Sequence, residues 1–355
     1  MHFYKQLIFF LFAVIFYSCN DDIVTTELKD YTSDFDSVWT AFDKYYPLFT
    51  YKNIEWEKVK IENRNKFFEI NQYQRNHYLA TALSILKDEH IYINVSSNNP
   101  IPAYRKVNIH KNYNEEYLNK FKQSINWKSI NQFWGWGKKD GFGYLAFYSF
   151  GRGEVDTLKF DTILDSLRNT DGIIIDLRKN GGGSLFIISA ICNRFTKNVT
   201  KVGSFIYRDG PNHDDFAEGI PVVAKPKGSW QYTKKVVLLI GENSISAAEI
   251  FAEVFLNFEN STLIGDTTRG ATIIPTTKKL DDGTTYMLPV AAFYNLDSEP
   301  LEWRGVFPDI YFNPDLLVND SEKDIMIEKA IELIKSHITR FSTRPPYLCG
   351  ILWRF

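Results

Sequence analysis

The first third of the chain shows the hydrophobic period of helices. Apolar side chains recur there every three or four residues, for example at Phe35, Trp39 and Phe42, and this spacing predicts amphipathic helices. The predicted helices occupy residues 34–46, 56–68 and 73–86. We therefore expect a small helical N-terminal domain over residues 34–96. Residues 97–140 show no clear period, and we expect an irregular connection there.

A different pattern begins near residue 141, where short apolar runs alternate with amphipathic segments. The runs predict strands at 143–150, 172–177, 236–240 and 262–264, and the amphipathic segments predict helices at 160–168, 185–195 and 247–258. Strands that alternate with helices favour a mostly parallel sheet with helical crossovers. We therefore expect an α/β core over residues 141–340, with a hairpin turn at Asp282-Gly283 and a C-terminal tail over residues 341–355.

The N-terminus has the pattern of a secretory signal over residues 1–18. Lys5 precedes the apolar run Leu7–Phe16, which is shorter than the roughly 20 residues of a membrane span. Cys19 follows the small residue Ser18, at the position of the lipidated cysteine in bacterial lipoproteins. We therefore expect a lipid anchor on Cys19, a polar tether over residues 19–33, and a place in the bacterial cell envelope, periplasmic or surface-exposed. Simple secretion with a free cysteine is the alternative.

Composition narrows the classes of function. The 355 residues carry 41 Lys and Arg against 43 Asp and Glu, a formal net charge of −2. Proteins that bind nucleic acids normally have a basic excess, so we expect no nucleic-acid partner. Three cysteines are too few for a disulfide scaffold or a cysteine-built zinc site, and no metal site is expected.

A candidate nucleophile lies in the segment Asn243–Glu249 (NSISAAE), between a predicted buried strand and a predicted helix. A serine at such a turn has an exposed hydroxyl, and the free N–H groups of the new helix point toward it. These donors could stabilise an oxyanion. The alternative is that Ser244 or Ser246 only caps the helix, since serine is a favoured N-cap residue.

A glycine-rich loop follows the predicted strand 172–177, in the segment Asp176–Gly183 (DLRKNGGG). Consecutive glycines let the backbone approach a ligand closely and permit positive φ angles. The loop could supply N–H donors to an oxyanion, although a tight connection or an anion nest fits the same residues. It lacks the GxxxxGK[ST] pattern of nucleotide-binding loops.

Together these two segments resemble the superfamily of C-terminal-processing (tail-specific) proteases and the tricorn core protease. Two further segments match the same family in the expected order, Leu86–His90 (LKDEH) and Glu302–Asp309 (EWRGVFPD). The resemblance spans residues 34–312. It implies a crotonase/ClpP-like α/β core and a serine-type peptidase that hydrolyses peptides or proteins through an acyl-enzyme, with no metal or organic cofactor. Residues 97–140 are too few for a PDZ module of roughly 80–100 residues, so none is expected.

The resemblance also suggests roles for single residues. Tail-specific enzymes use a lysine as base, but Ala271 holds that position here, so the chain looks like the tricorn-like branch, which uses histidine. This implies Ser246 as nucleophile, His90 as general base and Glu302 as the orienting carboxylate. The implied oxyanion donors are the N–H groups of Ala247 and Gly182, with Gly181 as the fallback.

Some positions leave alternatives open. Glu89 replaces the serine that precedes the histidine in tricorn-like enzymes, so Glu302 could contact His90 directly, or Glu89 could face solvent. His90 could be a structural helix-end histidine, and Glu302 a surface carboxylate beside Trp303. Further candidates for supporting roles are Asp176, Arg178, Asn180 and Glu249. A non-catalytic module that binds a peptide or lipid on the same fold is the main rival.

Overall fold

The computed structural model describes residues 27–313 and 323–342. The predicted signal segment (1–18), Cys19 and nearly all of the predicted tail (341–355) lie outside these residues, so the lipid anchor and the envelope location stay predictions. Within the described ranges, no helix has the length and apolar character needed to cross a bilayer.

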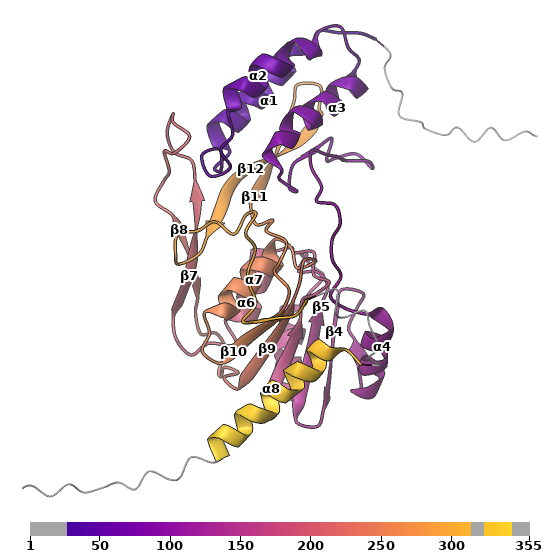
Figure 1. Cartoon of the computed structure of the whole chain (residues 1–355), viewed down its shortest axis with the longest axis vertical. Coiled ribbons are helices and arrows are strands. Elements are labelled where there is room, and N and C mark those ends of the chain that lie inside the picture. The colour runs from indigo at the N-terminus through magenta and orange to yellow at the C-terminus, as the bar shows by residue number, and fades with distance from the viewer. Residues whose placement is uncertain (1–26, 314–322, 343–355) are drawn as a thin grey trace, which may run out of the picture.

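A seven-stranded mixed sheet forms the centre of the molecule (Figure 1). Its strands lie in the order β13 (Ile310–Tyr311), β10 (Ser261–Gly265), β9 (Lys235–Ile240), β6 (Gly172–Asp176), β5 (Phe142–Phe147), β4 (Trp134–Lys139) and β3 (Lys128–Ser129). The strands from β13 to β5 are parallel, and β4 and β3 extend the sheet in antiparallel fashion. The apolar β6 is buried along its whole length, as expected for a strand covered on both faces.

Helices cover both faces of this sheet, because successive side chains of a strand point to opposite sides. Leu145, Ile175 and Leu238 pack in one core with helices α5 (Thr157–Ser166), α6 (Leu185–Cys192) and α7 (Ala247–Leu256). The side chains that alternate with these three along the same strands point to the other face. They pack in a second core with α4 (Glu115–Ser124) and α8 (Ile325–Ser342). The predicted α/β fold class is confirmed.

A second, antiparallel sheet carries the N-terminal helices. Its strands lie in the order β2 (Ile101–Pro102), β1 (Tyr92–Ile93), β12 (Thr285–Tyr294), β7 (Thr200–Tyr207) and β8 (Ile220–Ala224), and β11 (Ile274–Lys279) pairs with β12. The β11–β12 hairpin turns at Asp282-Gly283, as predicted. Helices α1 (Thr32–Tyr45), α2 (Trp56–Asn63) and α3 (Gln72–Leu83) lie at this end of the molecule (Figure 1).

One expectation about organisation is wrong. Residues 97–140 are not irregular: they contain α4 and strands β2, β3 and β4, and β4 pairs with β5 over six residues. The sequence WGWGKK does not predict β4, because its two glycines interrupt the alternation of side chains that is typical of a strand. The helical unit has no separate core, since its aromatic cluster includes Tyr286 and Leu288 of β12. The N-terminal helices are therefore folded onto a late part of the chain.

Candidate active site

Ser246 stands at the turn between β9 and α7, in a backbone conformation that side chains rarely adopt. Its φ is 59° and its ψ is −118°. Such torsions cost free energy in a residue other than glycine and persist only where neighbouring contacts impose them. Those contacts come from the loop after β6: the Ser244 hydroxyl donates to Leu177 O at 2.9 Å, and the Ile245 N–H donates to Asn180 O at 3.0 Å.

His90 reaches Ser246 from the other side of the site. It lies just before β1, and its Nε2 atom is 3.3 Å from Ser246 Oγ. This separation is within reach of a hydrogen bond between a nucleophile and its base, which is commonly long in the absence of substrate. The structure therefore brings together two residues that lie 156 positions apart in sequence.

Asp88 is the carboxylate that faces the other ring nitrogen of His90. Its Oδ1 lies 3.6 Å from His90 Nδ1 and accepts the His90 backbone N–H at 2.8 Å. Asp88 is fully buried. Within the described part of the chain, neither Asp88 Oδ2 nor His90 Nδ1 has a hydrogen bond. We did not single out Asp88 from the sequence, although its place two residues before His90 in LKDEH was a usable signal.

The charges around His90 favour its protonated form. Burial by itself would lower the pKa of His90, but the nearby carboxylates of Asp88, Glu302 and Glu249 outweigh burial and raise the pKa above 6.5. Burial by itself would raise the pKa of Asp88. His90 and Lys52 outweigh burial and hold the pKa of Asp88 below its ordinary value.

Glu302 is buried, with 1% of its surface exposed, so its interpretation as a surface carboxylate is wrong. Its Oε1 accepts from Lys52 Nζ at 3.2 Å and its Oε2 from the Thr272 N–H at 2.9 Å. Among the described contacts there is no hydrogen bond from Glu302 to His90, so the direct link that we considered is not formed. Burial and the charge of Asp88 raise the pKa of Glu302 to about 7, against the effect of Lys52.

Lys52 is a second residue that the sequence did not reveal. It follows α1, its side chain is fully buried, and its Nζ atom also donates to Leu86 O at 2.9 Å. The same ammonium lies 4.4 Å from the centre of the Trp303 ring. Lys52 therefore supplies the positive charge that the buried carboxylates of Asp88 and Glu302 need. No local motif marks it, because its partners are distant in sequence.

Glu249 connects the turn that contains Ser246 (the predicted nucleophile turn) to the segment that contains Ala271. Its carboxylate is fully buried and accepts from the N–H groups of Ser246, Gly270 and Ala271 at 2.9, 2.6 and 2.9 Å. The Thr268 hydroxyl adds a fourth hydrogen bond, at 2.7 Å. Burial raises the pKa of Glu249, and these four donors oppose the rise.

The predicted oxyanion donors differ in their availability. Among the described residues, the Ala247 N–H has no hydrogen-bond partner, and it faces the glycine loop. The N–H groups of Gly182 and Gly181 are engaged within the loop, with Asn180 Oδ1 at 2.8 Å and Tyr148 O at 3.2 Å. In this conformation neither glycine N–H is free to act as the second donor, and the predicted role of Gly182 stays a prediction.

Among the described contacts, the side chains of the other predicted supporting residues bind neither Ser246 nor His90, and they stabilise the surrounding segments instead. Asp176 and Arg178 form a buried ion pair at 2.7 Å, and Arg178 also binds Asp324. Asn180 donates from its amide to Phe147 O. Glu89 pairs with Arg269 at 2.9 Å. In the described ranges, no group of three or more His, Cys, Asp or Glu side chains could hold a metal ion.

The chain is similar to known peptidases. The model of peptidase family S41 matches residues 141–312. The carboxy-terminal processing protease CtpA of Bacillus subtilis (strain 168) is 30% identical over 175 residues, which are 49% of this chain and 35% of that protein. The chain thus spans about a third of the length of this curated relative.

Solved structures share the fold over most of the chain. A protein of Parabacteroides merdae ATCC 43184 superposes with a TM-score of 0.73 at 24% identity, covering 85% of this chain and 95% of that one. Mature CPAF in complex with lactacystin superposes with a TM-score of 0.64 at 13% identity, covering 89% and 99%. At these identities the likeness concerns the fold.

The close contact between the glycine loop and the nucleophile turn yields a prediction. Gly182 has a φ of +92°, and a Cβ atom there would lie 2.7 Å from Ile245 O and 2.8 Å from Ser246 Cβ. We expect Gly182→Ala to displace Ser246 and slow its reaction with a fluorophosphonate probe about 100-fold, the usual effect of a displacement of about 1 Å.

Gly181→Ala is the matched control, because a Cβ atom at Gly181 meets no atom within 4 Å. Its rate of labelling should stay close to that of the wild type. Circular dichroism confirms that both variants fold. Equal rates of labelling in the two variants would contradict the proposed contact.

Proposed function

We propose that the chain is a serine-type peptidase of family S41, whose family model matches residues 141–312, and that it cleaves peptides or proteins. The observation that carries the proposal is the approach of His90 Nε2 to within 3.3 Å of Ser246 Oγ. The strained torsions of Ser246 support it, because such strain is typical of catalytic turns.

Ser246 Oγ attacks the carbonyl carbon of the scissile peptide bond, and His90 Nε2 takes the hydroxyl proton. The Ala247 N–H stabilises the negative oxygen of the tetrahedral intermediate. When the C–N bond breaks, His90 returns the proton to the leaving amine, and an ester on Ser246 remains. A water molecule, deprotonated by His90, then hydrolyses this ester and regenerates the serine.

In this proposal Asp88 takes the place next to His90 that the resemblance assigned to Glu302. A neutral His90 must carry its proton on Nδ1 to accept one at Nε2, and Asp88 Oδ1 is the acceptor that faces Nδ1. The carboxylate also stabilises the imidazolium that forms during attack. Glu302 acts one step further away, through its ion pair with Lys52.

The second oxyanion donor requires a local rearrangement. The Gly182 N–H becomes available once it leaves Asn180 Oδ1, and a substrate oxygen that develops negative charge is the stronger acceptor. The absence of a side chain at Gly182 lets the backbone approach the reacting carbonyl. We therefore propose that binding of the substrate carbonyl exchanges this hydrogen bond and completes the oxyanion hole.

Cleavage of a proteome-derived peptide library, followed by mass spectrometry, tests this function. We expect Ser246→Ala and His90→Ala each to lower the rate of cleavage by at least about 10³-fold, because the two groups act as a unit. The exposed Ser189 and the partly buried His77 provide matched controls, and Ser189→Ala and His77→Ala should retain activity. A folded wild type that binds library peptides without cleaving them would instead favour a non-catalytic binding module.

The dependence of kcat/KM on pH distinguishes the two carboxylates. His90 must be neutral to act as the base, so the rate should rise with pH through a midpoint above 6.5. Asp88→Asn removes the negative charge that most strongly favours the imidazolium. The midpoint should therefore move to lower pH, and the plateau should fall about 10²–10⁴-fold as His90 loses its orientation.

Glu302→Gln is the comparison variant for this experiment, and it should move the midpoint less than Asp88→Asn. A larger shift in Glu302→Gln would assign the orienting role to Glu302 instead. Thermal unfolding of both variants shows whether the buried cluster tolerates the change.

A further inference from the structure

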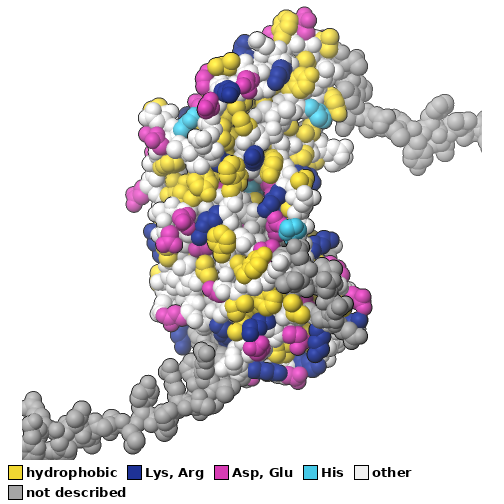
Figure 2. Space-filling view, viewed as in Figure 1, with side chains coloured by type: hydrophobic (Ala, Val, Ile, Leu, Met, Phe, Trp, Pro, Cys, Tyr) yellow, Lys and Arg dark blue, Asp and Glu magenta, His cyan; other side chains and the backbone are white. Residues whose placement is uncertain are grey.

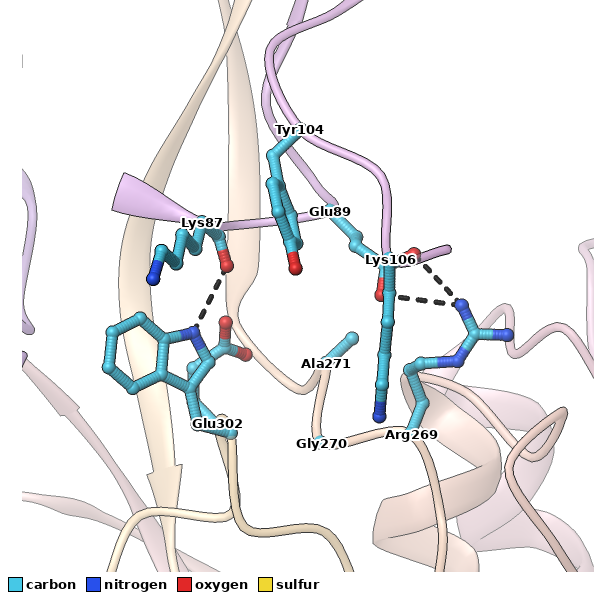
Figure 3. Close-up of a pocket in the computed structure, with 9 residues that line it drawn as sticks. Lys87, Glu89, Tyr104, Lys106, Arg269, Gly270, Ala271 and Glu302 are labelled. Atoms are coloured by element: carbon cyan, nitrogen blue, oxygen red, sulfur yellow. Dashed lines mark hydrogen bonds and ion pairs between the residues drawn. The ribbon is translucent and has the colours of Figure 1, made fainter. Parts of the chain in front are cut away.

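An ion pair between Glu89 and Arg269 lies in the wall of a pocket of about 320 Å³ (Figure 3). One guanidinium nitrogen of Arg269 donates to both carboxylate oxygens of Glu89, at 2.9 and 3.3 Å. The Arg269 side chain is 7% exposed and that of Glu89 is 20% exposed. Figure 3 shows that the two side chains meet from separate segments of the chain. The pair is therefore better shielded from water than an ordinary surface ion pair, which contributes little.

The Glu89 end of the pair belongs to the segment that carries the base. This histidine segment, Leu86–His90, ends with Glu89 directly before His90. Backbone carbonyls of the segment accept hydrogen bonds from the side chains of Lys52 and Trp303. Because Glu89 and His90 are consecutive, a displacement of Glu89 also displaces the base.

The Arg269 end of the pair is attached to the backbone of the nucleophile turn. Its Nε atom donates to Glu242 O at 2.8 Å, and its backbone N–H donates to Ser244 O at 3.1 Å. Both acceptors lie within four residues of Ser246. A guanidinium is planar and rigid, so the hydrogen bond of Nε also orients the nitrogen that meets Glu89. Arg269 is thus held in place by the turn that it supports.

Two polar contacts join the histidine segment to the nucleophile turn and residues 268–271, within the part of the chain that the structure describes. One is the approach of His90 to Ser246 at 3.3 Å, and the other is the pair of Glu89 with Arg269. A catalytic contact that is long in the absence of substrate is a weak constraint. The ion pair is therefore the interaction that can fix the distance between base and nucleophile.

We propose that Arg269 is a positioning residue, which binds Glu89 and so keeps His90 Nε2 within reach of Ser246 Oγ. The proposal rests on the proposed peptidase function and adds to it the residue that sets the distance between base and nucleophile. Its action is indirect, through Glu89 on one side and the backbone of the nucleophile turn on the other. Loss of the pair lets the two segments separate, and a separation of about 1 Å costs up to about 10²-fold in rate.

A double-mutant cycle, read as the rate at which a fluorophosphonate probe labels Ser246, tests this role. We expect Glu89→Gln and Arg269→Met each to slow labelling by about 10- to 100-fold. The two changes remove the same interaction, so the double variant should be no slower than the slower single variant. Slow labelling in Arg269→Met alone would mean that Arg269 supports only the nucleophile turn, and it would overturn the proposal. Effects that multiply in the double variant would overturn it too.

Arg194→Met is the matched control for the loss of a buried arginine. The Arg194 side chain is 6% exposed, and it pairs with Asp161 and donates to Trp230 O, none of which belongs to the site. Arg194→Met should therefore keep the wild-type rate of labelling. Equal slowing in Arg194→Met and Arg269→Met would show a general loss of stability and would contradict the positioning role.

Nuclear magnetic resonance of the histidine rings separates this proposal from the proposed function. The chain has six histidines, and the signal of His90 is the one that disappears in His90→Ala. We expect Arg269→Met to shift this signal and Arg194→Met to leave it unchanged. If the probe does not label the wild type but Arg269→Met shifts the signal, the positioning role is supported and the peptidase proposal fails. If the wild type is labelled and Arg269→Met changes neither the rate nor the signal, the positioning role alone fails.

Discussion

The buried carboxylate of Glu249 holds together the two segments on which the site depends. A carboxylate removed from water is costly unless hydrogen bonds replace its hydration. Glu249 obtains four such bonds, and they come from the nucleophile turn and from the segment 268–271. These four hydrogen bonds therefore fix the position of Ser246 relative to Ala271, which lines the edge of the neighbouring pocket. The seven-stranded sheet supports this arrangement by ending β6 and β9 side by side.

A second layer of buried charge surrounds His90. Asp88, Glu302 and Lys52 are drawn from three distant parts of the chain, and all three side chains are almost completely removed from solvent. The positive charge of Lys52 makes two buried carboxylates tolerable, while the carboxylates favour a protonated His90. The N-terminal helical unit thus contributes to the surroundings of His90, because Lys52 follows α1 and packs against Tyr46 of the aromatic cluster. On the visible face of the molecule, acidic and basic side chains are interspersed (Figure 2), in keeping with the near-neutral net charge.

The features of the site that could be predicted are those that belong to short sequence motifs. Ser246 stands in a strand-to-helix turn with a recognisable motif, and His90 ends another motif, so the pair could be proposed before the structure. Lys52 could not be proposed, because a buried ion pair between residues 250 positions apart has no local period. The engaged N–H of Gly182 was also beyond prediction, since it depends on how the Asn180 amide is oriented. Strand β4 was missed because its glycines, of which Gly135 accommodates the Trp127 ring, lower the strand propensity.

The central claim is that Ser246 is a nucleophile activated by His90, and the acyl-enzyme tests it most directly. The purified chain can be mixed with an activated peptide ester, quenched in acid within milliseconds, and digested for mass spectrometry. A burst of about one product per chain, with the acyl group on the peptide that contains Ser246, is the result expected of covalent catalysis, and His90→Ala should abolish both. An acyl group on another residue, or an unchanged burst in His90→Ala, would contradict the claim.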